Sequence, residues 1–510
     1  MKIKYEELLT CALYVAVVVF FLYAFLFRSY VMDDSYIGYR FSKNFADGNG
    51  LVWNPGDDPV QGYSNFLWTV LAGIFMKLSW DYIFWMKMTG IVFSLLGMYL
   101  TYLIGMRLFN DKARAMIPVI LMGMTVSYGF WAVGSMEVNV FIAFMLAGMY
   151  YSMKEIEHPP AVPVAAFMWV LCALTRHEGA VIFTITWFFL LSQAMQYKDG
   201  KLHMDKKRFI YLLKMGVIFS VPYLGYLYWS NAVYGYPLPA PFYGKRKAWE
   251  GISAITHFLK TYWPFGPLAL LGLLVTFRSK LRWFYGYLAT TALTLLLLLV
   301  NRDTIMNVEF RLTLYVLVLF YILSVPALKF IAFHLKKYSL GPLVIILGFI
   351  LLMVVPIRPF TIHEAYDTHM RYAMNLKNVQ GGIGLWINET APKNVTVSTV
   401  DAGILLLNSE RRAIDHWGLS DEYIAHNGFD LGYFWSQHPD IIVMFSIYPD
   451  RFVTNYNSEV QMVNDPYFRD NFELIYVDKW AGQDYCQWVF ARKELNLTSK
   501  APKTAMYKAA

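Results

Sequence analysis

Residues 8–27 read LLTCALYVAVVVFFLYAFLF, a run of 20 residues without a charged side chain. As a helix, such a run is long enough to cross the roughly 30 Å of hydrocarbon in a bilayer. Lys2 and Lys4 precede the run, and no small-residue cleavage site follows it. We therefore expect an uncleaved membrane span rather than a signal peptide.

Ten further apolar runs follow, so we predict a multi-spanning α-helical membrane protein with about 11 transmembrane helices. The further runs cover residues 83–106, 115–132, 138–152, 161–175, 179–197, 209–229, 264–277, 283–300, 311–328 and 340–357. The composition of the 510 residues, 57% hydrophobic and only 16% charged, agrees with this prediction and excludes an ordinary water-soluble assembly.

Positive charge is distributed unevenly over the loops. With a cytoplasmic N-terminus and one crossing per run, the inner loops carry Arg107, Lys112, Arg114 and the basic stretch 198–208, as the positive-inside rule requires. Counting the apolar residues 65–79 as a span would reverse this pattern. We therefore predict an interfacial helix there, within a first outer loop of about residues 28–82.

Residues 358–510 differ from the rest of the chain and are predicted to lie on the outer side. They contain 14 Lys+Arg against 18 Asp+Glu, whereas residues 1–357 contain 30 against 18. Residues 363–389 have helical polarity with an interruption at Gly381-Gly382. Strand-like runs follow at 395–400, 441–445, 472–477 and 487–491. The pattern predicts a C-terminal soluble α/β domain, 358–510, after a transmembrane catalytic domain, 1–357.

Two adjacent acids, Asp33 and Asp34, open the first outer loop. Either can cap a helix that runs to about Asp47 and is closed by Gly48. Capping needs only one carboxylate, however. A carboxylate at a helix N-terminus is held ionised, which suits a general base or a cation ligand. The spacing alone leaves two roles open for these acids, a structural helix cap and a functional acid.

Fixed charges recur at the outer ends of other spans. They include Glu137, Arg176, Glu178, Asp303, Arg311 and the basic triplet that begins at Lys245. Structural ion pairing and contact with lipid headgroups are the alternative explanations. Together with the abundant Tyr and Trp, these groups suit a sugar phosphate, because Arg and Lys stabilise a phosphate leaving group and a carboxylate takes the proton of an attacking hydroxyl. The chain has no Gly-rich phosphate loop, which favours a lipid-linked donor over a soluble nucleotide.

Four blocks of residues resemble the membrane-embedded GT-C glycosyltransferases, most closely the branch of the mycobacterial terminal β-(1→2) arabinofuranosyltransferases and their bacterial relatives. The blocks are 33–37 with 48–56 and 62–68; 135–137 with 175–179; 234–245; and 401–403 with 412–421. The chain departs from the usual pattern at His177, where Pro is usual, and at Ala240, where Asn is common.

The resemblance implies a polyprenyl-phosphate sugar donor, an inverting single displacement and an active site on the outer face of a bacterial cytoplasmic membrane. It maps the essential acidic pair of the family onto Asp33 and Asp34, with Asp33 the first choice for the base. The donor-phosphate ligands that it implies are Arg176, Lys245 and Arg311. The residues that it implies for orienting sugar or acceptor are Glu137, Glu178, Asp303, Tyr63 and Asn65. A divalent cation is left open, because oligosaccharyltransferases use one and lipid A aminoarabinose transferases need not.

We therefore predict a glycosyltransferase that moves arabinofuranose or another pentose from a polyprenyl phosphate to a cell-envelope glycan or surface protein. Its partners are the donor, the acceptor and membrane lipid, with no nucleic acid. The alternatives are a transporter or flippase of a lipid-linked sugar and an envelope scaffold without catalysis. No inverted repeat is visible, and the ionisable residues gather at the outer rim, which speaks against a transporter.

Overall fold

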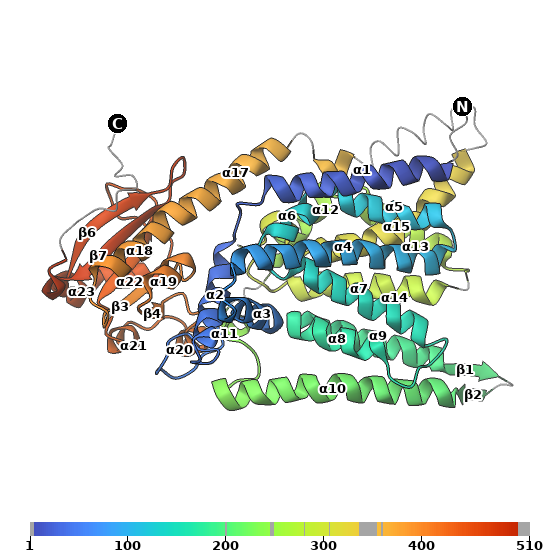
Figure 1. Cartoon of the computed structure of the whole chain (residues 1–510), viewed down its shortest axis with the longest axis horizontal. Helices are drawn as coiled ribbons and strands as arrows, with labels where there is room; N and C mark the ends of the chain where they lie inside the picture. The colour runs from blue at the N-terminus through green and yellow to red at the C-terminus, as the bar shows by residue number, and fades with distance from the viewer. Residues whose placement is uncertain are drawn as a thin grey trace. The chain divides into compact units, whose positions relative to one another are not determined.

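The computed structural model of the chain divides into two compact units (Figure 1). The structure describes residues 5–198, 201–244, 249–279, 281–304, 306–335, 354–358 and 361–497. The unit that we call the helical unit comprises Met1–Arg28, Ile83–Tyr226 and Arg246–Tyr366. The sheet unit comprises Ser29–Tyr82, Leu227–Lys245 and Asp367–Ala510.

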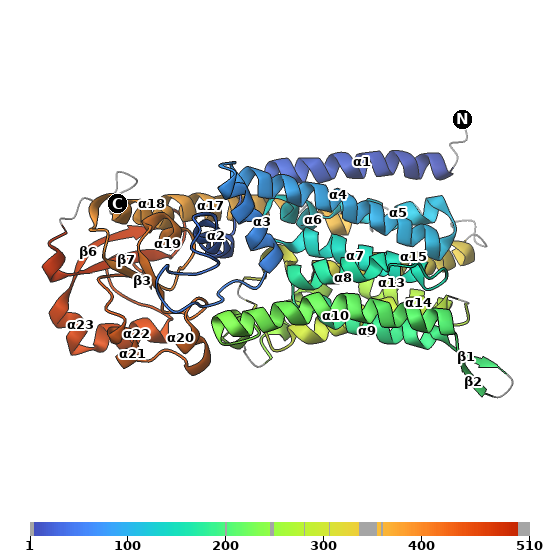
Figure 2. The ribbon, with the colours of Figure 1, turned by 60° about the horizontal axis from the view of Figure 1, so that its bottom comes forward.

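The helical unit is built from apolar helices that lie side by side in both views (Figures 1 and 2). They are α1 (Tyr5–Leu26), α4 (Tyr82–Phe109), α5 (Lys112–Met124), α6 (Val126–Val133), α7 (Val138–Glu155), α8 (Val164–Thr175), α9 (Glu178–Ala194), α10 (Lys206–Tyr234), α12 (Gly251–Thr261), α13 (Phe265–Thr276), α14 (Arg282–Leu299) and α15 (Leu314–Leu335). A hairpin of β1 (Met195–Lys198) and β2 (Lys201–Met204) separates α9 from α10.

Five of the described helices are long and apolar enough to cross a membrane, namely α1, α4, α10, α14 and α15. The number rises to seven if each of two bent pairs is one span, so the predicted number of about 11 is not confirmed. Most of the predicted run 340–357 lies outside the described residues.

Two of the predicted runs differ from the structure because the backbone turns. Residues 115–132 form α5 and α6, bent by 63° where Thr125 adopts an extended conformation. The run 264–277 is α13 alone, and the sequence analysis missed α12, which precedes it at an angle of 81°. Pro264 lies at that break, where it cannot donate a helical backbone hydrogen bond.

The sheet unit contains a mixed five-stranded sheet in the order β4-β3-β5-β7-β6. Its strands are β3 (Thr396–Thr399), β4 (Arg412–Asp415), β5 (Ile441–Ser446), β6 (Phe472–Lys479) and β7 (Cys486–Arg492). Strand β3 pairs parallel with β4 and β5, whereas β7 pairs antiparallel with β5 and β6. The sequence analysis predicted four of these strands. Strand β4 was not predicted, because its four residues, Arg412-Ala413-Ile414-Asp415, carry a charge at each end and form no apolar run.

Short helices complete the sheet unit, and α17 leads into it. They are α2 (Asp33–Ala46), α3 (Phe66–Lys77), α11 (Ala240–Gly244), α17 (Ile362–Asn375), α18 (Gly381–Thr390), α19 (Ile404–Ser409), α20 (Glu422–Asn427), α21 (Leu431–Ser436), α22 (Asn457–Asn464) and α23 (Pro466–Asn471). The predicted helical interruption at Gly381-Gly382 is wrong, because a π turn at Leu376–Gln380 precedes an unbroken α18. The predicted helix over 65–79 is present as α3, and its interfacial position stays a prediction.

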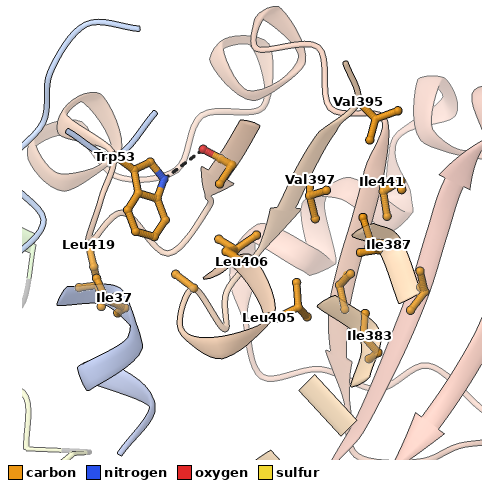
Figure 3. Close-up of a cluster of buried hydrophobic side chains, with 14 of the residues drawn as sticks. Ile37, Trp53, Ile383, Ile387, Val395, Val397, Leu405, Leu406, Leu419 and Ile441 are labelled. Carbon is orange, nitrogen blue, oxygen red and sulfur yellow. Dashed lines mark hydrogen bonds between the residues drawn. The ribbon is translucent and has the colours of Figure 1, made fainter. Parts of the chain in front are cut away.

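The first outer loop packs into the core of the sheet unit (Figure 3). Trp53 is 2% exposed, and its indole N–H donates to the carbonyl oxygen of Ala413 at 3.1 Å. Asn54 accepts from the Ala413 N–H at 2.9 Å and donates to its carbonyl at 2.9 Å. Asn54 therefore supplies edge strand β4 with the two hydrogen bonds that another strand would make.

A buried arginine fixes helix α2 in the same unit. Arg40 is 7% exposed, and its guanidinium donates to backbone carbonyls of Trp53, Leu406 and Arg411 and to the side chain of Asn54. Because these bonds satisfy its donors, the buried charge is tolerated. By packing, Ser29–Tyr82 thus belongs with the C-terminal residues, although hydropathy predicts a domain boundary at 357/358.

Candidate functional site

The two acids of the first outer loop occupy the first turn of α2 in the sheet unit. The helix begins at Asp33, and its N-cap residue is Met32, which offers no side-chain cap. The predicted capping role of Asp33 or Asp34 is therefore wrong, because both residues already have helical backbone conformation. The predicted end of the helix is close to the observed one, with Asp47 as C-cap and Gly48 at a φ of +90°.

The Asp33 carboxylate lies against the loop that joins β3 to α19. Its Oδ1 accepts a hydrogen bond from the backbone N–H of Ile404 at 3.0 Å. A Cβ atom placed on Gly403 would lie 2.0 Å from this Oδ1 and 2.4 Å from Oδ2. Only a residue without a side chain at position 403 leaves room for the carboxylate. The backbone from Gly403 to Ile404 thus forms a seat for Asp33.

The surroundings of this seat favour the protonated form of Asp33. Burial is the main cause, and the negative charges of Asp401 and Asp34 add to it. The N–H groups of Ile404 and Gly403 act in the opposite direction. Together they raise the pKa of Asp33 from 3.8 to about 7. A carboxylate with such a pKa both takes up and releases a proton near neutral pH, as a general base must.

A second set of predicted site residues comes together in the helical unit. Arg176 lies between α8 and α9 and binds two carboxylates, Glu137 at 2.6 Å and Glu178 at 3.0 Å. Arg302 pairs with Glu178 at 2.9 Å, and Arg311 lies 3.8 Å from Glu137. We call these three arginines and two glutamates the arginine cluster. Its arginines exceed its acids by one charge.

The backbone supports the arginine cluster at the junction of α8 and α9. Gly179 follows Glu178, and a Cβ atom there would lie 2.6 Å from the backbone nitrogen of Ala173. Glycine thus lets the first turn of α9 approach the end of α8 closely. The predicted block 175–179 therefore combines charged side chains with a glycine that close packing requires. The sequence analysis did not include Arg302 among the site residues, although it lies next to Asp303.

The remaining predicted site residues are Lys245, Asp303, Tyr63 and Asn65. Lys245 is outside the described residues. Asp303 is half-buried in the loop that follows α14. Tyr63 is 2% exposed, and its hydroxyl contacts that of Tyr234 at 2.9 Å. Asn65 precedes α3 and accepts from the Thr69 hydroxyl at 3.0 Å. The roles of these four residues in binding stay predictions.

The helical unit contains another buried ion pair, between Glu309 and Arg358. Glu309 lies in a 3-10 turn (Val308–Phe310) with a φ of +43°, which is unusual for a non-glycine residue. Its carboxylate also accepts from Ser127 at 2.9 Å, and its carbonyl oxygen accepts from the indole of Trp131 at 2.9 Å. These contacts hold the strained turn in place.

Among the described residues, no group of three or more His, Cys, Asp and Glu side chains is arranged to hold a metal ion. The sequence analysis left metal use open, and the arrangement of the described acids adds no candidate centre. Asp401 and Gly403 were quoted in the fourth block but were not assigned to the site. Their only signal was membership of that block, because the contact of Asp33 with Gly403 and Ile404 spans some 370 residues of sequence.

Comparison with solved structures shows the fold of the chain. The ArnT of Cupriavidus metallidurans in its apo state is 13% identical, with a TM-score of 0.53 over 96% of this chain and 99% of that chain. ArnT bound to undecaprenyl phosphate is 11% identical, with a TM-score of 0.55 over 94% and 97%. The apo oligosaccharyltransferase of Archaeoglobus fulgidus is 12% identical, with a TM-score of 0.54 over 85% and 69%.

These similarities show that the chain has the fold of ArnT and of the oligosaccharyltransferase, in agreement with its five described helices that are long and apolar enough to cross a membrane. The family described as a domain of unknown function (DUF8728) matches residues 364–496. No curated protein matches the chain by sequence. The arabinofuranosyltransferase branch stays a prediction, because the comparisons reach only the wider fold.

Proposed function

We propose that this protein is a membrane glycosyltransferase that transfers a sugar from a polyprenyl phosphate to an acceptor hydroxyl, with Asp33 as the general base. The proposal rests on the observation that the backbone at Gly403 and Ile404 holds the Asp33 carboxylate. It combines a fixed position, through Ile404 and Gly403, with a proton affinity suited to neutral pH. The fold shared with ArnT and the oligosaccharyltransferase supports the reaction class.

In the proposed reaction Asp33 accepts the proton of the acceptor hydroxyl while the acceptor oxygen attacks the anomeric carbon of the donor. The bond between that carbon and the phosphate oxygen breaks, and the polyprenyl phosphate leaves with the bonding electrons. Attack opposite the leaving group inverts the anomeric configuration. Asp34 stands beside the base in the same helical turn and adds negative charge to its surroundings.

The leaving phosphate requires cationic groups, and the arginine cluster is the proposed source. Arg176 and Arg311 belong to a group in which three arginines are held at fixed positions by Glu137 and Glu178. Fixed charges of this kind stabilise a developing anion without reorganisation. Lys245 is the further proposed ligand. The undecaprenyl phosphate bound to ArnT supports a lipid phosphate as the group recognised here.

The finer parts of the proposal rest on the sequence resemblance. They are an arabinofuranose or another pentose as the donor sugar, and a cell-envelope glycan or surface protein as the acceptor. Glu137, Glu178 and Asp303, with Tyr63 and Asn65, are the proposed residues for orienting sugar or acceptor. We place the reaction on the outer face of the bacterial cytoplasmic membrane, because the basic loops favour the cytoplasmic side.

Transfer by the purified full-length protein tests this function. Incubation with a panel of undecaprenyl- and decaprenyl-phosphate sugars, followed by mass spectrometry, should reveal a glycosylated acceptor. Asp33→Asn should reduce turnover about 10²–10⁴-fold, the usual contribution of a general base. Asp478→Asn, which changes another buried acid of the sheet unit, is the matched control and should leave turnover unchanged. Wild-type turnover in the Asp33→Asn protein would refute the assignment of the base.

A further inference from the structure

The loop from β3 to α19 contains a second carboxylate, Asp401, which its neighbours hold firmly. The hydroxyl of Tyr485 donates to Asp401 Oδ2 at 2.5 Å, and the side-chain amide of Gln487 donates to the same oxygen. The backbone N–H of Asp401 donates to the hydroxyl of Thr399 at 3.1 Å. Hydrogen bonds to the ionised form favour a carboxylate over a carboxylic acid. These donors favour the ionised form of Asp401 and oppose burial, which raises its pKa.

The same loop also contacts the carboxylate of Asp33. Asp401 lies two residues before Gly403, whose missing side chain makes room for the Asp33 carboxylate, and three before Ile404, which donates to it. Among the charges that act on Asp33, that of Asp401 is the strongest. The two acids therefore form a pair in which each ionised group disfavours ionisation of the other.

Several other titratable groups face this pair. Asp34 and Tyr36 are on α2, Tyr372 on α17, Tyr485 just before β7, His416 after β4 and Glu459 on α22. Burial lowers the pKa of His416 to about 3 and raises the pKa of Glu459 to about 8. At pH 7 both are therefore mainly uncharged, so neither neutralises Asp401.

We propose that Asp401 is a positioning residue of the transfer reaction, a fixed negative neighbour that makes Asp33 able to take up the proton of the acceptor. The proposal rests on the proposed function, because it assigns a task to Asp33 in that reaction. Two close carboxylates titrate as a pair in which the member with more side-chain hydrogen-bond donors favours its ionised form and the other holds the proton. Asp401 has two side-chain donors, whereas Asp33 is held by backbone N–H groups.

Infrared titration of the full-length protein in detergent tests the pair without requiring turnover. The C=O stretch of protonated carboxyl groups is followed against pH, and the spectrum of an Asp33→Asn protein is subtracted to isolate Asp33. The midpoint for Asp33 should lie near pH 7. In an Asp401→Asn background it should fall by about one pH unit. In an Asp478→Asn background, which alters a buried acid elsewhere in the sheet unit, it should not move.

A second variant keeps the test decisive if Asp401→Asn does not fold. Tyr485→Phe retains both carboxylates and removes one donor from Asp401, so Asp401 is less ionised at pH 7. The Asp33 midpoint should then fall, but by less than in Asp401→Asn. An unmoved midpoint in the folded variants would overturn the inference.

The pH profile of sugar transfer separates this inference from the proposed function. In Asp401→Asn the acidic limb of turnover should move to lower pH together with the infrared midpoint, which a merely structural role would not cause. If no donor is used by the wild-type protein, the proposed function fails. The infrared titration then still decides whether Asp401 controls the protonation of Asp33.

Discussion

Asp33 in the sheet unit and Glu137 in the helical unit are both carboxylates removed from bulk water, but their neighbours differ. Glu137 is fully buried and binds the guanidinium of Arg176 at 2.6 Å. The strongest charges around Asp33 are those of Asp401 and Asp34, which have its own sign. A neighbouring arginine favours the ionised form of a carboxylate, whereas neighbouring acids favour the protonated form.

This difference gives the two units distinct electrostatic properties. The arginine cluster is a source of permanent charge, which suits the binding of an anion. The surroundings of Asp33 let its carboxylate gain and lose a proton near neutral pH, which suits proton transfer. Sequence patterns showed acids and bases at the ends of spans in both regions. The identity of the nearest neighbours separates a fixed ion from a titrating acid.

The largest expected effect comes from removing the charge that balances the acids of the arginine cluster. Arg176→Met leaves Glu137 and Glu178 with weaker partners in a buried place, so it should cost about 3–5 kcal/mol of stability. Thermal unfolding in detergent measures the loss. Arg208→Met is the control, because its pair with Asp205 is longer, at 3.7 Å, and more exposed, and should contribute about 0–1 kcal/mol. Equal losses in the two variants would contradict the described role of Arg176.

The second-largest effect is expected from a substitution at Gly403, the residue that makes room for the Asp33 carboxylate. Gly403→Ala introduces a Cβ atom where the Asp33 carboxylate lies, so the carboxylate must move away. Displacement of a base by about 1 Å can cost about 100-fold in rate, and we expect a loss of that size in sugar transfer. In the control Gly432→Ala, the nearest atom lies 3.4 Å from the new Cβ, and transfer should be normal. Normal transfer by Gly403→Ala would show that the seat has no part in the reaction.

A smaller effect is expected from the pH dependence of stability. The folded pKa of Asp33, about 7, lies above its ordinary value of 3.8, so the folded protein binds this proton more tightly than the unfolded chain. Stability from this group is therefore lost as pH rises from about 4 to about 7. Asp33→Asn removes that loss and should therefore be more stable than wild type at pH 8.

Thermal unfolding at pH 5 and pH 8 measures this difference, which should be larger at pH 8. A variant that is less stable than wild type at both pH values would instead identify Asp33 as a structural residue.

The smallest effect concerns Tyr63. Tyr63→Phe removes its hydroxyl contact with Tyr234, whose own hydroxyl keeps the carbonyl of Leu51 as a partner at 2.9 Å. We expect a loss of about 1 kcal/mol in unfolding free energy, and a transfer assay decides whether the hydroxyl also contacts the sugar. Tyr423→Phe, at a side chain 41% exposed, serves as the control. Impaired transfer with unchanged stability would instead support the predicted contact of Tyr63 with sugar.

Local patterns in the sequence predicted much of the fold. The helix from Asp33 to Ala46 was expected from its acidic start and from Gly48 at its end, and four strands of the sheet followed from short apolar runs. Strand β4 and helix α12 were not predicted because charged or polar residues interrupt their apolar residues, Arg412 and Asp415 in β4 and His257 and Lys260 in α12. The bend at Thr125 was missed because an apolar run has the same composition whether it is straight or bent.

The sequence by itself predicted a membrane protein with acids and arginines at the ends of its helices, because hydropathy and charge are properties of neighbouring residues. Only the tertiary structure decided which charges meet. The contact of Asp33 with Gly403 and Ile404, and the grouping of Arg176 with Glu137, Arg302 and Arg311, join residues far apart in the chain. Proton affinity depends on distances in space, and no local pattern contains them.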